Sequence, residues 1–217
     1  MSHHPIAGFG FLAVMLGGIG FLSFKGIESS QAYEADRRAQ QELHRQEEEA
    51  RAHQEAARSR AEEIQNHIRT AVMAAQRDDF PVAIEVLKKA ADRFNDSTAL
   101  WLNLGIAQRG AELWDDAELS FKRVLVLDPN DWDAVAESAT IRVVKGDLDG
   151  AFGFFDRIPP GEGRMLERLA YDPTFNELDK EPRFTALVAK HGATELRRDS
   201  LARVKEETVA PKPAPKP

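Results

Sequence analysis

The 217-residue chain contains no cysteine, which excludes disulfide bonds, thiolate nucleophiles and cysteine-ligated metals. Its net charge is −7 at neutral pH, so it lacks the basic balance that nucleic-acid binding requires. The six histidines form no HExxH-type pair, and no carboxylates surround them at metal-ligand spacing. We therefore expect no enzymatic activity, no cofactor or metal, and no nucleic-acid partner.

Charged residues are also missing from Pro5 to Phe24. About 20 apolar residues in a helix span a hydrocarbon core of roughly 30 Å, so residues 1–28 are predicted to be a transmembrane anchor. A cleaved signal peptide is the alternative, but the segment has no basic start and no small-residue cleavage site. Small residues fall on one stripe through which membrane helices can associate. These are Gly10, Ala13, Gly17 and Gly20.

The basic residues near the anchor lie on its C-terminal side, at Lys25, Arg37 and Arg38, and none precedes it. The positive-inside rule then places the C-terminal part in the cytoplasm, as a single-pass protein of the cell (inner) membrane. A periplasmic orientation stays open, because one adjacent lysine is a small bias.

Residues 29–63 contain neither glycine nor proline and are rich in Glu, Arg, Gln and Ala. Opposite charges recur at i,i+4, as in Glu34–Arg38 and Glu47–Arg51. Such pairs stabilise an exposed helix, and the residues around them are strong helix formers. The segment is therefore predicted to be a charged helical stalk.

A heptad spacing within the stalk raises the alternative of a coiled coil. The residues that follow it are Leu43, Ala50, Ala57 and Ile64. The intervening seam positions hold Gln46, His53 and Arg60, which would pack poorly. We expect a solvated single helix. A homo-oligomer formed through the stalk or the membrane helix remains an alternative.

A self-similarity with a period of about 34 residues covers residues 64–165. Superposing 64–97, 98–131 and 132–165 aligns two columns of small residues with columns of bulky apolar ones. The small columns are Ala71, Gly105, Ala139 and Ala83, Ala117, Ala151; bulky columns are Phe80, Trp114, Leu148 and Leu87, Phe121, Phe155. Small residues let helices approach closely while large ones fill the space beside them, so this period predicts stacked helix–turn–helix units.

The middle unit resembles the tetratricopeptide repeat, and the flanking units match it more loosely. The matching residues are Trp101, Leu104, Gly105, Ala117, Phe121 and Pro129. The resemblance implies an all-α solenoid, a right-handed stack of antiparallel helix pairs with a concave, ligand-accepting face. It also implies protein–protein recognition rather than catalysis.

In this family the first helix of each unit lines the concave face. The residues that the resemblance places there include Ile68, Arg69, Val72, Leu102, Asn103, Ile106, Arg109 and Glu137. Relatives that clamp a chaperone's C-terminal carboxylate carry Lys or Arg where this chain has Asp133 and Glu137, so that mode is disfavoured. We expect a basic or neutral partner segment across Arg69, Asn103 and Arg109. The alternative is that these faces are merely solvated and the partner docks elsewhere, such as on the convex side.

Beyond the repeats, residues 166–207 are predicted to form capping helices, because a solenoid needs an end unit over its last apolar face. Their Asp-Pro-x-Phe and Pro-Arg-Phe-x-x-Leu sequences resemble the endings of many bacterial tetratricopeptide-repeat proteins. Residues 208–217, rich in proline and lysine, are expected to be extended and disordered.

Together these patterns predict a membrane-anchored scaffold that binds a protein partner, of unspecified identity, through its repeats. The alternative is a structural subunit of a membrane complex. In that case the main contacts come from the membrane helix and stalk, and the repeats serve as a packing block.

Overall fold

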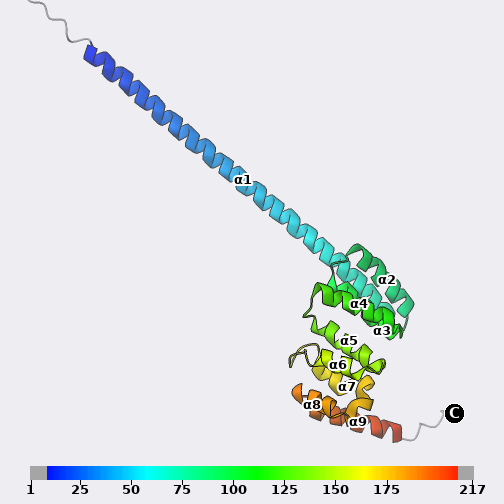
Figure 1. Ribbon diagram of the computed structural model, residues 1–217. Coiled ribbons are helices and arrows are strands. Elements are labelled where there is room, and N and C mark those ends of the chain that lie inside the picture. The colour runs from blue at the N-terminus through cyan, green and yellow to red at the C-terminus, as the bar shows by residue number, and fades with distance from the viewer. Residues whose placement is uncertain (1–8, 210–217) are drawn as a thin grey trace, which may run out of the picture. The chain divides into compact units, whose positions relative to one another are not determined.

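The computed structural model describes residues 9–209, with side chains for residue 31 and for residues 33–205. Every regular element in this range is a helix, which confirms the all-α prediction (Figure 1). The chain divides into two compact units between Ala61 and Glu62. Each is described by itself below.

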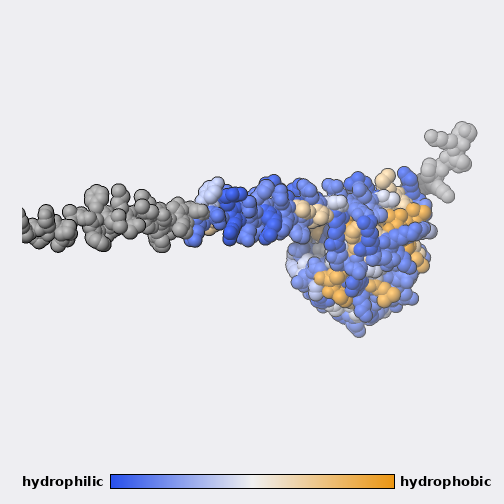
Figure 2. All heavy atoms as spheres, turned by 90° about the horizontal axis from the view of Figure 1, so that it is seen from above, coloured by the Kyte–Doolittle hydropathy of each residue, from blue (hydrophilic) through white to orange (hydrophobic). Residues whose placement is uncertain are grey.

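The described part of the first unit, residues 9–61, is helix and belongs to α1 (Phe9–Ala75). Its described side chains between Gln31 and Ala61 are all exposed, and Figure 2 shows this stretch as a hydrophilic surface. Ion pairs at i,i+4 join Arg38 to Glu34 at 3.6 Å and Arg51 to Glu47 at 3.9 Å. The described part of this unit is therefore an exposed helix that local charge pairs stabilise.

No helix is long and apolar enough to cross a membrane among the residues whose side chains are described. The segment predicted to be the anchor, residues 1–28, lies outside those residues.

The second unit begins with the last part of α1 and continues as paired helices. Their bounds are α2 (Phe80–Arg93), α3 (Thr98–Gly110), α4 (Trp114–Leu127), α5 (Trp132–Val144) and α6 (Leu148–Phe155). The helices α2, α4 and α6 begin 34 residues apart. Each helix from α2 to α5 packs on the next, and α3 also packs on α5. These contacts confirm stacked helix–turn–helix repeats.

Helical structure continues to the end of the described chain. The elements are α7 (Met165–Tyr171), the 3-10 helix η1 (Pro173–Lys180), α8 (Pro182–Lys190) and α9 (Thr194–Val209). The start of α8 lies 34 residues after that of α6, so the helical period extends past residue 165. Pro173 and Pro182 stand in first turns, where a missing N–H costs nothing.

A buried arginine fastens α9 to the helices before it. Arg197 is 5% exposed and donates hydrogen bonds to the Leu169 carbonyl, the Asn176 side chain and Asp179, each at 3.0 Å. Its guanidinium also lies 5.3 Å from the centre of the Phe184 ring. The contacts therefore reach α7, η1 and α8.

The core is built from the repeat columns. All the small residues of the two columns are buried, together with Phe121 and Phe155; they are Ala71, Ala83, Gly105, Ala117, Ala139 and Ala151. A Cβ added at Gly105 would lie 2.5 Å from the Phe121 ring, which explains the glycine at that position. Trp101 is half-buried, and its Nε1 donates to the Asn95 carbonyl at 3.0 Å.

The turn inside each pair repeats as well. Asp78, Glu112 and Gly146 occupy the same place one period apart, and all three have positive φ, at 60°, 60° and 78°. Left-handed backbone at this place ends the first helix of each pair. At the start of the third unit Asp131 caps α5 by accepting from the Ala134 N–H at 2.9 Å.

Candidate functional site

An open groove of about 630 Å³ lies among α3, α5, α7 and the start of η1. We call it the α3–α7 groove. It is lined by Ile106, Arg109, Glu137, Arg164, Glu167, Arg168, Tyr171, Asp172, Pro173 and Thr174. Residues more than 60 positions apart in the sequence meet in it because the first helices of successive units stack side by side.

A buried carboxylate forms the floor of the groove. Glu137 on α5 is 2% exposed, and its Oε1 accepts a hydrogen bond from Arg168 Nη2 at 2.9 Å. Arg109 Nε from α3 lies 2.9 Å from the other oxygen, Oε2. That second contact is an ion pair without hydrogen-bond geometry, since neither atom has a hydrogen-bond partner. One buried acid thus holds two arginines from helices on either side of it.

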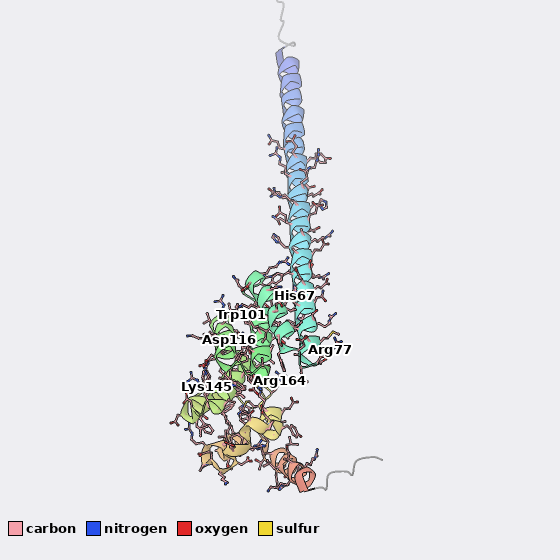
Figure 3. The ribbon with its side chains drawn as sticks, turned by 90° about the vertical axis from the view of Figure 1, so that its right-hand side faces the viewer. His67, Arg77, Trp101, Asp116, Lys145 and Arg164 are labelled. Carbon is pink, nitrogen blue, oxygen red and sulfur yellow. The ribbon has the colours of Figure 1, made fainter. Side chains whose placement is uncertain are left out.

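A second ion pair forms one wall. Arg164 Nε donates to Asp133 Oδ1 at 3.0 Å, and Arg168 Nη2 lies 3.5 Å from the same oxygen. Arg164 precedes α7 and is labelled in Figure 3. Its φ is 49°, a left-handed conformation that is unusual for a residue with a side chain.

The connection before Arg164 is fixed in place by close packing. Gly163 has a φ of 60°, and a Cβ there would lie 2.8 Å from the Trp132 carbonyl oxygen. Arg168 Nε donates to the Gly163 carbonyl at 3.1 Å. The strained residue is therefore held between α5 and α7 rather than on a free loop.

Three of the residues predicted for the concave face line the α3–α7 groove: Ile106, Arg109 and Glu137. The other five do not line it. Ile68 and Leu102 pack against buried clusters, Asn103 Nδ2 donates to the Ala99 carbonyl at 2.8 Å, and Arg69 and Val72 are exposed.

Glu137 differs from what was expected of it. The predicted preference for a basic or neutral partner assumed that Asp133 and Glu137 present free carboxylates. Glu137 is buried between Arg109 and Arg168, and Asp133 is bound by Arg164. Neither acid is free to attract a basic ligand, so that preference loses its physical basis.

The sequence prediction did not include the far side of the groove. Arg164, Glu167, Arg168 and Tyr171 lie at or beyond the point where the aligned columns end. The available signal was Pro182, which stands 34 residues after Leu148, the start of α6. A helix that begins at Pro182 would be the second helix of a fourth unit. The first helix of that unit would then come before it in the chain, where α7 is found.

A different surface exposes apolar side chains without forming part of the groove. On α4, Leu119 is 65% exposed and Val126 is 64% exposed, two turns apart on one side of the helix. Apolar patches are also visible on the repeat unit in Figure 2.

Among the residues that the structure describes, no group of three or more His, Asp or Glu side chains could hold a metal ion.

Comparison with known proteins identifies the repeats. The tetratricopeptide repeat family model matches residues 68–131 and, in an overlapping placement, residues 102–163. Among solved structures, the chain is similar to the type III secretion translocator chaperone SycD of Yersinia enterocolitica, crystallised as an alternative dimer. The two are 19% identical, the alignment covers 63% of this chain and 94% of that one, and the TM-score is 0.43. No curated protein sequence matches significantly.

Proposed function

We propose that this chain, which carries tetratricopeptide repeats from residue 68 to residue 163, binds a protein partner in the α3–α7 groove. We further propose that residues 1–28 anchor it in the cell inner membrane with the repeats in the cytoplasm. It would then act as a scaffold that holds the partner near the membrane.

The observation that carries the binding proposal is the groove itself. It is open and combines arginine side chains with an apolar wall made by Ile106, Pro173 and the 54% exposed Tyr171. Tyrosine and arginine are the side chains that most often dominate binding energy at protein interfaces. Arg109 and Arg168 are oriented by Glu137, so a partner does not have to immobilise them.

Membrane attachment is supported by the uncharged stretch from Pro5 to Phe24 and by the basic residues that follow it. Carbonate washing of isolated membranes should leave the protein in the pellet, and its intact mass should include residues 1–25. Release by carbonate, or a mature chain that starts near residue 25, would refute the anchor without affecting the groove.

The groove can be tested by affinity purification of the full chain followed by identification of the retained proteins. Ile106→Ala with Tyr171→Ala should weaken capture of the partner by about 30-fold, the equivalent of losing one hot spot. The matched control is Leu119→Ala with Val126→Ala, which removes exposed apolar side chains outside the groove. Tryptophan fluorescence verifies folding, because Trp101, Trp114 and Trp132 all lie in the second unit. Loss of capture in the control and not in the groove variant would place the partner on α4.

A further inference from the structure

Two of the arginines that line the α3–α7 groove keep free hydrogen-bond donors. Of its carboxylates, Glu137 is buried between two arginines, and Asp172 Oδ1 accepts from the Thr174 N–H at 2.9 Å, which caps η1. Asp133 beside the groove is bound by Arg164. By contrast, the terminal guanidinium nitrogens of Arg109 and Arg164 make no hydrogen bond within the described residues. A ligand in this groove therefore meets unused N–H groups from two arginines.

Arg164 is held in the groove despite an unfavourable backbone conformation. Left-handed backbone is costly for any residue with a Cβ, and glycine occupies it freely at Gly161 and Gly163 just before it. In this conformation, at φ 49°, the Arg164 side chain pairs with Asp133 through Nε and lines the groove. Strained residues of this kind cluster at binding sites.

One of the three carboxylates that line the groove is exposed and would repel an acidic ligand. This is Glu167, which has no ion-pair partner among the described residues. Three arginines and three carboxylates line the groove, so their formal charges cancel and long-range attraction cannot choose the ligand. Selection has to come from directional, charge-assisted hydrogen bonds, for which a guanidinium matches the geometry of a carboxylate or a phosphate. A carboxylate brings less charge into repulsion with the exposed Glu167.

We propose that the α3–α7 groove selects its partner by an aspartate or glutamate side chain, which binds the free guanidinium nitrogens of Arg109 and Arg164. The residue next to that acid is apolar and packs on Ile106, Tyr171 and Pro173. The proposal rests on the proposed function, since it names the chemistry of the segment that the groove binds. It reverses the expectation of a basic or neutral segment.

The test is selection of a random 12-residue peptide library, displayed with its C-terminus fused to the phage coat protein, against the immobilised full chain. The fusion removes free C-terminal carboxylates, so only side chains can supply the acid. Selected peptides should be enriched in Asp or Glu beside an apolar residue. In the strongest binder, replacing that acid by its amide should weaken binding about 10-fold or more, as expected for a charge-assisted pair.

Variants of the chain separate this contact from general loss of binding. In Arg109→Gln with Arg164→Gln, the acid and its amide should bind equally. In the control Arg183→Gln, which removes an exposed arginine paired with Asp149 outside the groove, the preference for the acid should remain. Glu167→Gln should tighten binding of the acidic peptide, because it removes the exposed carboxylate charge of the groove. Tryptophan fluorescence checks that each variant is folded.

Two kinds of failure can be told apart. Peptides that need Ile106 and Tyr171 but show no preference for an acid, or prefer a base, would overturn the acidic selection and leave the groove as a binding site. Peptides whose binding is unaffected by Ile106→Ala with Tyr171→Ala would overturn both the selection and the proposed function. An acid preference that survives Arg109→Gln with Arg164→Gln would assign the contact to other residues and refute the proposal.

Discussion

Both units of this chain are helical among the described residues, but the contacts that stabilise them differ. From Gln31 to Ala61 the helix has only exposed side chains among those described, and its partners lie one turn away. In the repeat unit, the contacts join one helix to the next along the chain, and small and large side chains pack together in a buried core. The comparison teaches that helix formation in the first unit is a local property, whereas in the second it depends on neighbouring helices.

The sharpest way to break the repeat unit is to fill one of its close contacts. Ala117 is fully buried in the small column of α4, beside Phe121 and Ile141. Ala117→Trp should lower the free energy of unfolding by about 3 kcal/mol or more, at the upper end of overpacking effects. The free energy of unfolding would be measured by urea unfolding followed by tryptophan fluorescence, with the signal of the added tryptophan taken into account. Unchanged stability would show that the repeat register is wrong.

A smaller loss of stability is expected when a buried charged side chain is removed from the repeat unit. Arg197→Ala leaves Asp179 and the Leu169 carbonyl without their donor, which should cost about 2–3 kcal/mol. Arg198→Ala is the matched control, because Arg198 is the next residue in α9 and its side chain is 75% exposed. This substitution should change the free energy of unfolding by less than about 0.5 kcal/mol. Equal effects of the two substitutions would mean that α9 is not fastened by Arg197.

One substitution should strengthen the repeat unit. Glu112 has a φ of 60° at the place where the next unit has Gly146. Glu112→Gly removes the conformational cost of a side chain in left-handed backbone and should stabilise the unit by about 0.5–1 kcal/mol. The comparison is Glu112→Ala, which keeps a Cβ and should gain nothing. Destabilisation by glycine would indicate that this turn is not left-handed in solution.

The smallest effect is expected in the first unit. Glu47→Ala removes the pair with Arg51, whose side chains are 52% and 73% exposed, and should change helix stability by at most about 0.5 kcal/mol. Circular dichroism at 222 nm during thermal unfolding would follow the whole helix content, and tryptophan fluorescence would follow the repeat unit alone. A shift in the fluorescence transition would mean that the two units do not unfold independently.

Periodicity in the sequence was sufficient to predict the core of the repeats. Ala83, Ala117 and Ala151 recur at the repeat spacing, and all three are buried. A residue type that recurs at a fixed spacing indicates a packing environment that recurs with it. The cap at Asp131 has a local signal instead, since an aspartate before a helix accepts from the backbone N–H three residues ahead.

The groove could be predicted only in part. Glu137 stands where the repeat pattern implies an exposed residue, and its burial depends on Arg168, 31 residues further along the chain. Neither that pairing nor the left-handed backbone of Arg164 has a local sequence signal. The far wall was missed because α7 continues the helical order of the repeats without their columns of small and large residues.

Site-specific photo-crosslinking in cells tests the central claim, that a protein partner binds in the α3–α7 groove. A benzophenone amino acid in place of Tyr171 lies in the groove, and one in place of Leu119 lies on the exposed side of α4. Both positions are exposed, at 54% and 65%, so either can report a bound protein. We expect a discrete crosslinked partner from position 171 and none from position 119. The same partner crosslinked from position 119 but not from position 171 would contradict the assignment of the groove as the binding site.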